Sequence, residues 1–325
     1  MASAVSTRPN RSSLRVWASV RASTFAANSR TSRGSSSNSS VRSRRRSSAR
    51  HSGWVSSSLT RSWKSCTLNA ILVPLRFYPK AGIISQGRRE RRVTDGVVLL
   101  EKAPPLARVI LNRPGVINAI NIEIRDALFD LMPALALDPE VEAVIFAGQG
   151  RAFSSGADVR EFGTAPSVVV AKQVRWLRDI WGLLIDFPKL TVAAIHGFAI
   201  GAGVELALCL DLRVASAETV FAVPETAFGM IPGAGGSQTL PRAVGVGRTL
   251  DLILTGRRIN ADQALAWGLV DRVVPTGEHL AASEALAREV LRVGPDLVRR
   301  AKAAVNIGLN LPLQFGLLLE RALGA

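Results

Sequence analysis

A glycine-rich stretch, His196-Gly197-Phe198-Ala199-Ile200-Gly201-Ala202-Gly203-Val204-Glu205, joins an apolar run to the start of a short apolar helix. Small residues at a helix start let a ligand approach the backbone closely, and the free N–H groups there favour a negative charge. The stretch lacks the Gly-Lys-Ser/Thr sequence of a phosphate-binding loop, and Leu206 stands where the dinucleotide-binding fingerprint has its third glycine. We therefore interpret it as a site for a developing oxyanion, with close helix–strand packing as the alternative.

Two carboxylates accompany this turn. Glu205 lies on the apolar helix, where burial would favour its use as a general acid or base, and a structural ion pair with Arg213 is the alternative. Glu225 follows Pro224 in a short polar break between apolar runs, where it could simply begin a helix. Together, two carboxylates beside backbone N–H groups can add water to a polarised double bond, or remove it.

Strand-like and helix-like segments alternate along the body of the chain, which predicts an α/β fold. The expected strands cover residues 97–100, 107–111, 141–147, 190–195, 212–215 and 220–222. The expected helices include residues 121–136, 167–185, 278–292 and 295–307. From Gly236 onward we expect nearly all of the chain to be helical, with a helix cap at 259–262.

Residues 1–92 form a basic leader in front of a nearly neutral body. They hold 19 Lys and Arg and one acidic residue, whereas residues 93–325 hold 22 basic and 24 acidic side chains. Low hydrophobicity with high like charge predicts disorder for the leader. An Arg-rich, Ser-rich and acid-poor N-terminus is typical of an organellar transit peptide, so we expect the mitochondrial matrix, with the plastid as the alternative. A basic RNA-binding arm is the rival interpretation, although its aromatic residues are sparse for base stacking.

The composition argues against several classes of protein. Two cysteines, Cys66 and Cys209, cannot form a disulfide scaffold and do not have the spacing of zinc ligands. No apolar run reaches the roughly 18–20 residues of a membrane-spanning helix, so we expect no membrane segment. The body is long enough to bury one large hydrophobic core.

Several motifs, taken in order and with their spacing, resemble the enoyl-CoA hydratase/isomerase (crotonase) family. They are Gly156-Ala157-Asp158, Gly201-Ala202-Gly203-Val204-Glu205, Pro224-Glu225 and Ile231-Pro232-Gly233-Ala234-Gly235-Gly236. Further landmarks of the family resemble Asn112-Arg113-Pro114 with Asn118-Ala119, and Thr255-Gly256-Arg257-Arg258-Ile259. The resemblance implies a crotonase-like spiral of ββα units with a C-terminal helical segment.

The resemblance also implies a substrate and a site. The substrate would be an acyl-CoA thioester whose carbonyl lies between the backbone N–H groups of Ala157 and Ala202, which form the oxyanion hole. Glu205 would activate water, Glu225 would give a proton to Cα, and the backbone of Gly233 would help to hold the water. The implied substrate-binding positions are Ala157, Asp158, Val159, Arg160, Gly201 and Gly233. No metal or redox cofactor is implied, because coenzyme A arrives as part of the substrate.

For organisation, we expect a leader over residues 1–92, a crotonase-like core over 93–260 and a helical oligomerisation segment over 261–325. The resemblance implies a homotrimer or a dimer of trimers. Members of the family usually continue some tens of residues past the position of Arg321, so we expect either a truncated chain or a more open pocket with reduced subunit contacts. The nearly neutral body predicts no nucleic-acid partner.

The leading hypothesis is therefore hydration of a 2-enoyl-CoA to a 3-hydroxyacyl-CoA, in fatty-acid or branched-chain amino-acid breakdown. Within the family, an enoyl-CoA isomerase or a hydratase of the methylglutaconyl-CoA type is the alternative. From another class, the alternative is a catalytically silent RNA-binding protein that uses its basic leader.

Overall fold

The computed structural model describes residues 96–170 and 177–324. The leader predicted for residues 1–92 lies outside the described residues, and so does the middle of the helix predicted for residues 167–185. Of that helix, the described part includes α5 (Ile180–Ile185).

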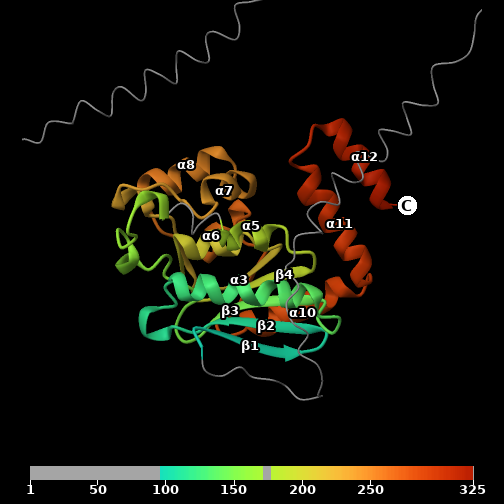
Figure 1. The fold of residues 1–325 in the computed structure, drawn as a ribbon, viewed down its shortest axis with the longest axis horizontal. Helices are drawn as coiled ribbons and strands as arrows, with labels where there is room; N and C mark the ends of the chain where they lie inside the picture. Colours follow the sequence, from blue (N-terminus) through green and yellow to red (C-terminus); the bar gives the residue numbers. More distant parts are fainter. Residues whose placement is uncertain (1–95, 171–176, 325) are drawn as a thin grey trace, which may run out of the picture. The chain divides into compact units, whose positions relative to one another are not determined.

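The main sheet has six strands in the order β1-β2-β3-β4-β6-β9 (Figure 1). The first two strands pair antiparallel, and every later pair of neighbours is parallel. The strands are β1 (Val98–Ala103), β2 (Leu106–Leu111), β3 (Ala143–Gly148), β4 (Leu190–Ile195), β6 (Leu212–Ser216) and β9 (Arg272–Val274). The sequence predicted all of them except β9.

Both faces of this sheet are covered, which explains why its inner strands are apolar along their whole length. In β3, Val144 and Phe146 belong to one hydrophobic core, whereas Ala143 and Ile145 belong to a second core. Side chains alternate between the faces of a strand, so each core lies on one face of the sheet. Helix α3 (Ile122–Leu137) contributes to the first core and α10 (His279–Leu291) to the second.

A smaller sheet carries the segments of interest for function. It consists of β5 (Phe198–Ile200), β7 (Val220–Ala222) and β8 (Ile259–Asn260), in the order β5-β7-β8. The pair β5–β7 is parallel and the pair β7–β8 is antiparallel. The order strand–strand–helix recurs along the chain, and it confirms the predicted ββα units.

The remaining helices follow the strands in sequence. They are α6 (Ala202–Leu208), α7 (Gly236–Val244), α8 (Val246–Thr255), α9 (Ala261–Trp267), α11 (Pro295–Gly308) and α12 (Leu313–Gly324). The described residues also form the short 3-10 helices η2 (Pro114–Val116), η3 (Val159–Glu161) and η4 (Glu225–Phe228). The predicted cap is confirmed, since the side chain of Asn260 accepts a hydrogen bond from the N–H of Gln263 at the start of α9. The prediction of nearly continuous helix after Gly236 missed β8 and β9, which have two and three residues.

Helix α11 is joined to the base of the main sheet by a largely buried lysine side chain. The Nζ atom of Lys302 donates to Oδ2 of Asp211 at 2.7 Å and to the carbonyl of Lys189 at 2.9 Å. The Lys302 side chain is 11% exposed, and burial lowers its pKa. The ion pair with Asp211 therefore offsets the cost of removing this ammonium group from water.

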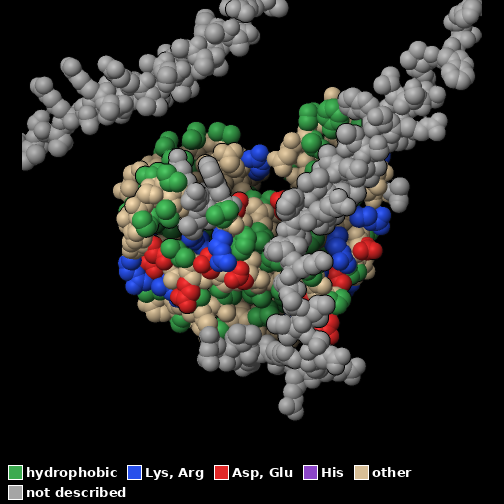
Figure 2. Space-filling view, in the orientation of Figure 1, with side chains coloured by type: hydrophobic (Ala, Val, Ile, Leu, Met, Phe, Trp, Pro, Cys, Tyr) green, Lys and Arg blue, Asp and Glu red, His purple; other side chains and the backbone are tan. Residues whose placement is uncertain are grey.

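The surface of the body agrees with its balanced charge. Figure 2 shows basic and acidic side chains intermingled on the visible face, without a field of one sign. Among the described residues, no helix is both long enough and apolar enough to span a membrane.

Lys302→Met should lower the free energy of unfolding by about 1–3 kcal/mol, because it leaves the partly buried Asp211 carboxylate without its cation. Arg300→Met, on the exposed face of the same helix, should change it by less than about 0.5 kcal/mol. Urea unfolding of both variants measures the difference. Equal effects would mean that Lys302 contributes nothing through its buried contact.

Candidate active site

The C-terminal ends of β5 and β7 meet at one edge of the small sheet. Ile200 pairs with Ala222, and the N–H of Gly201 donates to the Ala222 carbonyl at 2.8 Å. The segments that follow the two strands are α6, which begins at Ala202, and η4, which begins at Glu225. Parallel pairing therefore brings the glycine-rich turn and Glu225 together, although they are far apart in the sequence.

The loop before η3 forms a further strand-like edge beside β5. Ser154 bridges Ala199: the Ser154 N–H donates to the Phe198 carbonyl at 3.0 Å, and the Ile200 N–H donates to the Ser154 carbonyl at 3.1 Å. The same loop then reaches Ala157 and Asp158, two of the predicted site residues. It thus lies directly against the strand that leads into the glycine-rich turn.

The direction of the Ala157 N–H follows from a second bridge. Ile120 donates to the Gly156 carbonyl at 2.7 Å and accepts from the Asp158 N–H at 3.0 Å. In such a parallel bridge the residue between the two bonds, Ala157, directs its own N–H to the opposite side. Within residues 96–170 and 177–324, the Ala157 N–H donates to no backbone oxygen.

The Ala202 N–H is the second predicted donor of the oxyanion hole. Ala202 is the first residue of α6, so its N–H has no partner inside the helix. A Cβ atom added to Gly156 would lie 2.7 Å from the Ile200 carbonyl oxygen and 3.5 Å from the Ala202 nitrogen. The residue before Ala157 therefore contacts the start of α6, which brings the two predicted donors close together.

Glycines permit this close approach. Gly201 has φ 51° and ψ −119°, and an added Cβ would lie 2.4 Å from Oε1 of Glu225. An added Cβ on Gly203 would lie 2.9 Å from the Ser154 carbonyl oxygen. The packing interpretation of the glycine-rich turn thus holds for Gly203, while Gly201 makes room for a carboxylate.

Glu205 is 2% exposed and is held by backbone donors. Its Oε1 atom accepts from the N–H of Ala234 at 2.8 Å and from that of Gly236, the first residue of α7, at 2.7 Å. Two N–H donors stabilise a negative charge on this oxygen. The alternative of an ion pair with Arg213 is wrong, because Arg213 pairs with Asp271 and donates to two carbonyls.

Glu225 has a different environment. Burial, and secondarily the charge of Glu205, raise the pKa of Glu225 to about 7 from its ordinary value of 4.5. Among the described residues, its buried Oε2 atom has no hydrogen-bond partner. Burial and the charge of Glu205 thus both favour the protonated form of Glu225.

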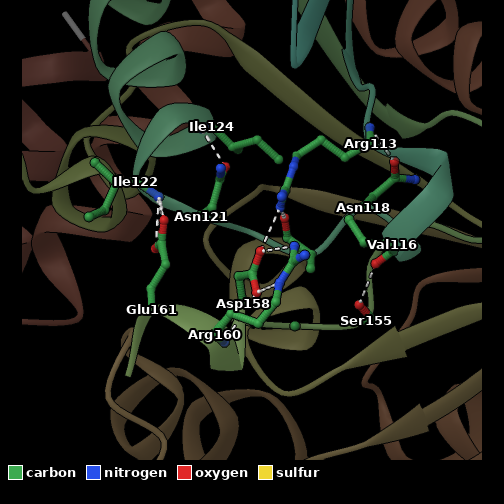
Figure 3. A network of polar contacts seen from close by, with 12 residues as sticks. Arg113, Val116, Asn118, Asn121, Ile122, Ile124, Ser155, Asp158, Arg160 and Glu161 are labelled. Atoms are coloured by element: carbon green, nitrogen blue, oxygen red, sulfur yellow. Dashed lines mark hydrogen bonds and ion pairs between the residues drawn. The ribbon is translucent and has the colours of Figure 1, made fainter. Parts of the chain in front are cut away.

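Asp158 is engaged in a network of polar contacts (Figure 3). Its carboxylate is 6% exposed and accepts from Arg160 at 2.7 and 2.9 Å and from Arg113 at 3.0 Å. Hydrogen bonds from Arg160 and Arg113 hold the pKa of Asp158 well below its ordinary value. Because this carboxylate is engaged by two arginines of the same chain, only the backbone of Asp158 could border a substrate.

The other predicted binding positions have mixed exposure. The side chains of Val159 and Arg160 are exposed, and Gly233 is half-buried in the loop that leads to the Glu205 donors Ala234 and Gly236. Their roles toward a substrate stay predictions. Among the described residues, no cluster of three or more His, Cys, Asp or Glu side chains could hold a metal ion.

Sequence reasoning assigned no role to two residues that organise this loop, Arg113 and Asn118. Asn118 is fully buried, has φ 53°, and donates from Nδ2 to the carbonyls of Gln149 and Ala152. Asparagine tolerates the left-handed region better than other non-glycine residues, but this alone does not reveal long-range partners. The only indication in the sequence was the family motif Asn112-Arg113-Pro114 with Asn118-Ala119, which contains both residues.

Comparison with known proteins gives concordant matches. A family model described as enoyl-CoA hydratase/isomerase matches residues 101–323. The chain is 37% identical over 225 residues to the crotonyl-CoA hydratase of Syntrophomonas wolfei, with 69% of this chain and 86% of that protein covered. It is 38% identical over 220 residues to enoyl-CoA hydratase domain-containing protein 2, mitochondrial, of Bos taurus, with coverage of 66% and 74%.

Solved structures give the same result. The chain is similar to the crystal structure of the enoyl-CoA hydratase from Bacillus anthracis, with a TM-score of 0.66 and 34% sequence identity. The match covers 70% of this chain and 89% of that chain. The fold is therefore the predicted crotonase-like one.

Glu225→Gln should raise the free energy of unfolding at pH 8 by about 1–3 kcal/mol. A carboxyl whose pKa is higher in the folded state loses stability as the pH rises from about 4.5 to about 7, and glutamine has no such loss. Urea unfolding at pH 4 and pH 8 measures the difference, which should be largest at pH 8. The exposed Glu278→Gln serves as control, and an identical pH dependence in all three proteins would contradict the expectation.

Proposed function

The chain belongs to the enoyl-CoA hydratase/isomerase family, and from this we propose that it adds water to a 2-enoyl-CoA thioester to form a 3-hydroxyacyl-CoA. The observation that carries the proposal is the meeting of four groups at one sheet edge: the N–H groups of Ala157 and Ala202 and the carboxyl groups of Glu205 and Glu225. The names of relatives that are called hydratases support the same reaction.

The two N–H groups would polarise the substrate. Donors aimed at the thioester oxygen stabilise the negative charge that develops there when a nucleophile adds to Cβ. The donor on α6 has the added advantage of a helix start, although this helix is only seven residues long. Both donors belong to the backbone, so their placement depends on loop geometry and not on side-chain type.

The two carboxyl groups would divide the proton transfers. Glu205, whose Oε1 atom is held by two N–H donors, would act as the carboxylate that takes a proton from water as the oxygen bonds to Cβ. Glu225, whose raised pKa keeps a proton available near pH 7, would give that proton to Cα. Water adds as one of its O–H bonds and the π bond between Cα and Cβ break while one C–O and one C–H bond form, and the proton then returns from Glu205 to Glu225.

The remaining parts of the proposal concern the setting of the reaction. Val159, Arg160 and the backbone of Asp158 would border the coenzyme A portion of the substrate, and the Gly201 and Gly233 backbones would border the reacting carbons and the water. No separate cofactor would be needed. We propose a homotrimer or dimer of trimers and a location in the mitochondrial matrix, the latter supported by a relative named as mitochondrial.

Glu205→Gln and Glu225→Gln should each lower kcat for hydration of a short 2-enoyl-CoA by about 10²–10⁴-fold, because each removes one proton-transfer group. Glu278→Gln, on an exposed position far along the chain, should keep the full rate. The loss of absorbance of the conjugated thioester measures the reaction. Full activity in both site variants would contradict the proposal.

The same assay distinguishes the alternatives within the family. Chromatography of the products from a 2-enoyl-CoA, a 3-enoyl-CoA and a methylglutaconyl-CoA would reveal a moved double bond in the case of an isomerase. Hydration of the branched thioester alone would identify the methylglutaconyl type. Binding of RNA by the full chain without any turnover would favour the silent RNA-binding alternative.

The value of kcat/KM should fall about tenfold per pH unit above about pH 7, since Glu225 must carry its proton to act as the acid. A pH–rate profile between pH 6 and pH 9 measures this limb. A rate that stays constant up to pH 9 would exclude Glu225 as the proton donor.

A further inference from the structure

The peptide between Gly156 and Ala157 decides whether the oxyanion hole has its first donor. Its carbonyl accepts from the N–H of Ile120 at 2.7 Å, which turns the Ala157 N–H the other way. If this peptide rotated, the carbonyl oxygen would replace the N–H at the site. Groups that hold Ile120 against this loop therefore control the donor without touching a substrate.

One guanidinium group joins the two sides of this bridge. Nη1 of Arg113 donates to the carbonyl of Ala119 at 2.6 Å and to Oδ2 of Asp158 at 3.0 Å. Ala119 precedes Ile120, and Asp158 follows Ala157, so Arg113 spans the bridge one residue to either side. Figure 3 shows Arg113 reaching across to Asp158 in this way.

The Arg113 side chain is itself fixed and largely buried. It is 17% exposed, and its backbone N–H donates to Oδ1 of Asn118 at 2.9 Å while its carbonyl accepts from the Asn118 N–H at 2.9 Å. Such a side chain loses little entropy when it forms further contacts. The backbone of Arg113 is therefore already fixed where its side chain begins to reach toward Ala119 and Asp158.

Arg160 offers a natural comparison. It also pairs with Asp158, with contacts at 2.7 and 2.9 Å, but its side chain is 63% exposed. Arg160 and Asp158 lie on the same segment, two residues apart, so their contact joins no second strand. Of the two arginines on this carboxylate, Arg113 is the one that crosses the bridge.

We propose that Arg113 is a positioning residue for the oxyanion hole: through Ala119 and Asp158 it fixes the Gly156–Ala157 peptide with the Ala157 N–H toward the thioester oxygen. This inference rests on the proposed function. It also gives Asp158 a role as the partner of Arg113 in place of a direct contact with the substrate. A lysine could keep the charge opposite Asp158 but lacks the planar fork of donors.

Arg113→Lys should lower kcat for hydration by about 10- to 100-fold, with KM changed by less than about threefold, because a misplaced donor weakens the transition state more than the bound substrate. Arg272→Lys, at an exposed arginine of β9 that pairs with Glu289, should keep kcat within about twofold. A rise in KM with constant kcat in Arg113→Lys would overturn the proposal, since it would indicate a role in substrate binding.

A spectroscopic measurement separates positioning from a general effect on folding. A saturated acyl-CoA with ¹³C at the thioester carbonyl is not hydrated, and its C=O stretch should move to lower frequency on binding to the wild-type protein. The move should be smaller in Arg113→Lys and unchanged in Arg272→Lys. An unchanged stretch in Arg113→Lys would overturn the proposal, whereas absence of both turnover and any shift in the wild type would instead overturn the proposed function.

Asp158→Asn tests the same link from its other end, should Arg113→Lys not fold in a thermal unfolding scan. It keeps the shape of the side chain and removes its charge. The expected result is again a reduced carbonyl shift and a reduced kcat with nearly constant KM. A normal carbonyl shift in a folded Asp158→Asn protein would overturn the proposal.

Discussion

The pairing of Ile200 with Ala222, in two parallel strands of only three residues each, is the constraint on which the site depends. A slip of one residue would turn every side chain of β5 to the other face and would separate Glu225 from Gly201. So short a pair cannot hold its register alone. Neighbours on both edges hold it: Ser154 lies beside β5 and β8 lies beside β7. The same contacts therefore fix both the register of the small sheet and the position of the loop that carries Ala157.

The same register makes two glutamates unequal. Glu205 lies where the loop before α7 presents N–H groups, and these donors stabilise its charge. Glu225 lies one strand away, half-buried and within the field of Glu205, where ionisation is costly. The two residues have the same chemistry in isolation, so their difference comes entirely from what surrounds them. A reaction that needs a base and an acid at neutral pH finds both in this pair.

Much of this arrangement could be predicted from the sequence. The features that could not be predicted are very short strands, contacts between distant residues and backbone hydrogen bonds. Strands β1 to β4, β6 and β7, the glycine-rich turn and the two carboxylates were predictable because each leaves a local pattern. Strands β5, β8 and β9, of two or three residues each, were not predicted. The contact between Arg113 and Asp158 joins residues 45 positions apart, and the donors to Glu205 are backbone groups, which look alike in every residue. Long-range partners and backbone donors leave no mark in composition or spacing.

The features that sequence reasoning missed are also those that would destabilise an ordinary loop. Ile117 and Asn118 both have positive φ, a conformation that costs free energy in residues other than glycine, and Glu225 is half-buried with a raised pKa. The two hydrophobic cores on opposite faces of the main sheet stabilise the fold and so offset the free-energy cost of these features. The bonds of Asn118 to the carbonyls of Gln149 and Ala152 hold this strained turn against the loop that leads to Ala157. That loop carries a donor of the proposed oxyanion hole, so the strained turn supports the peptide whose orientation has the greatest chemical consequence.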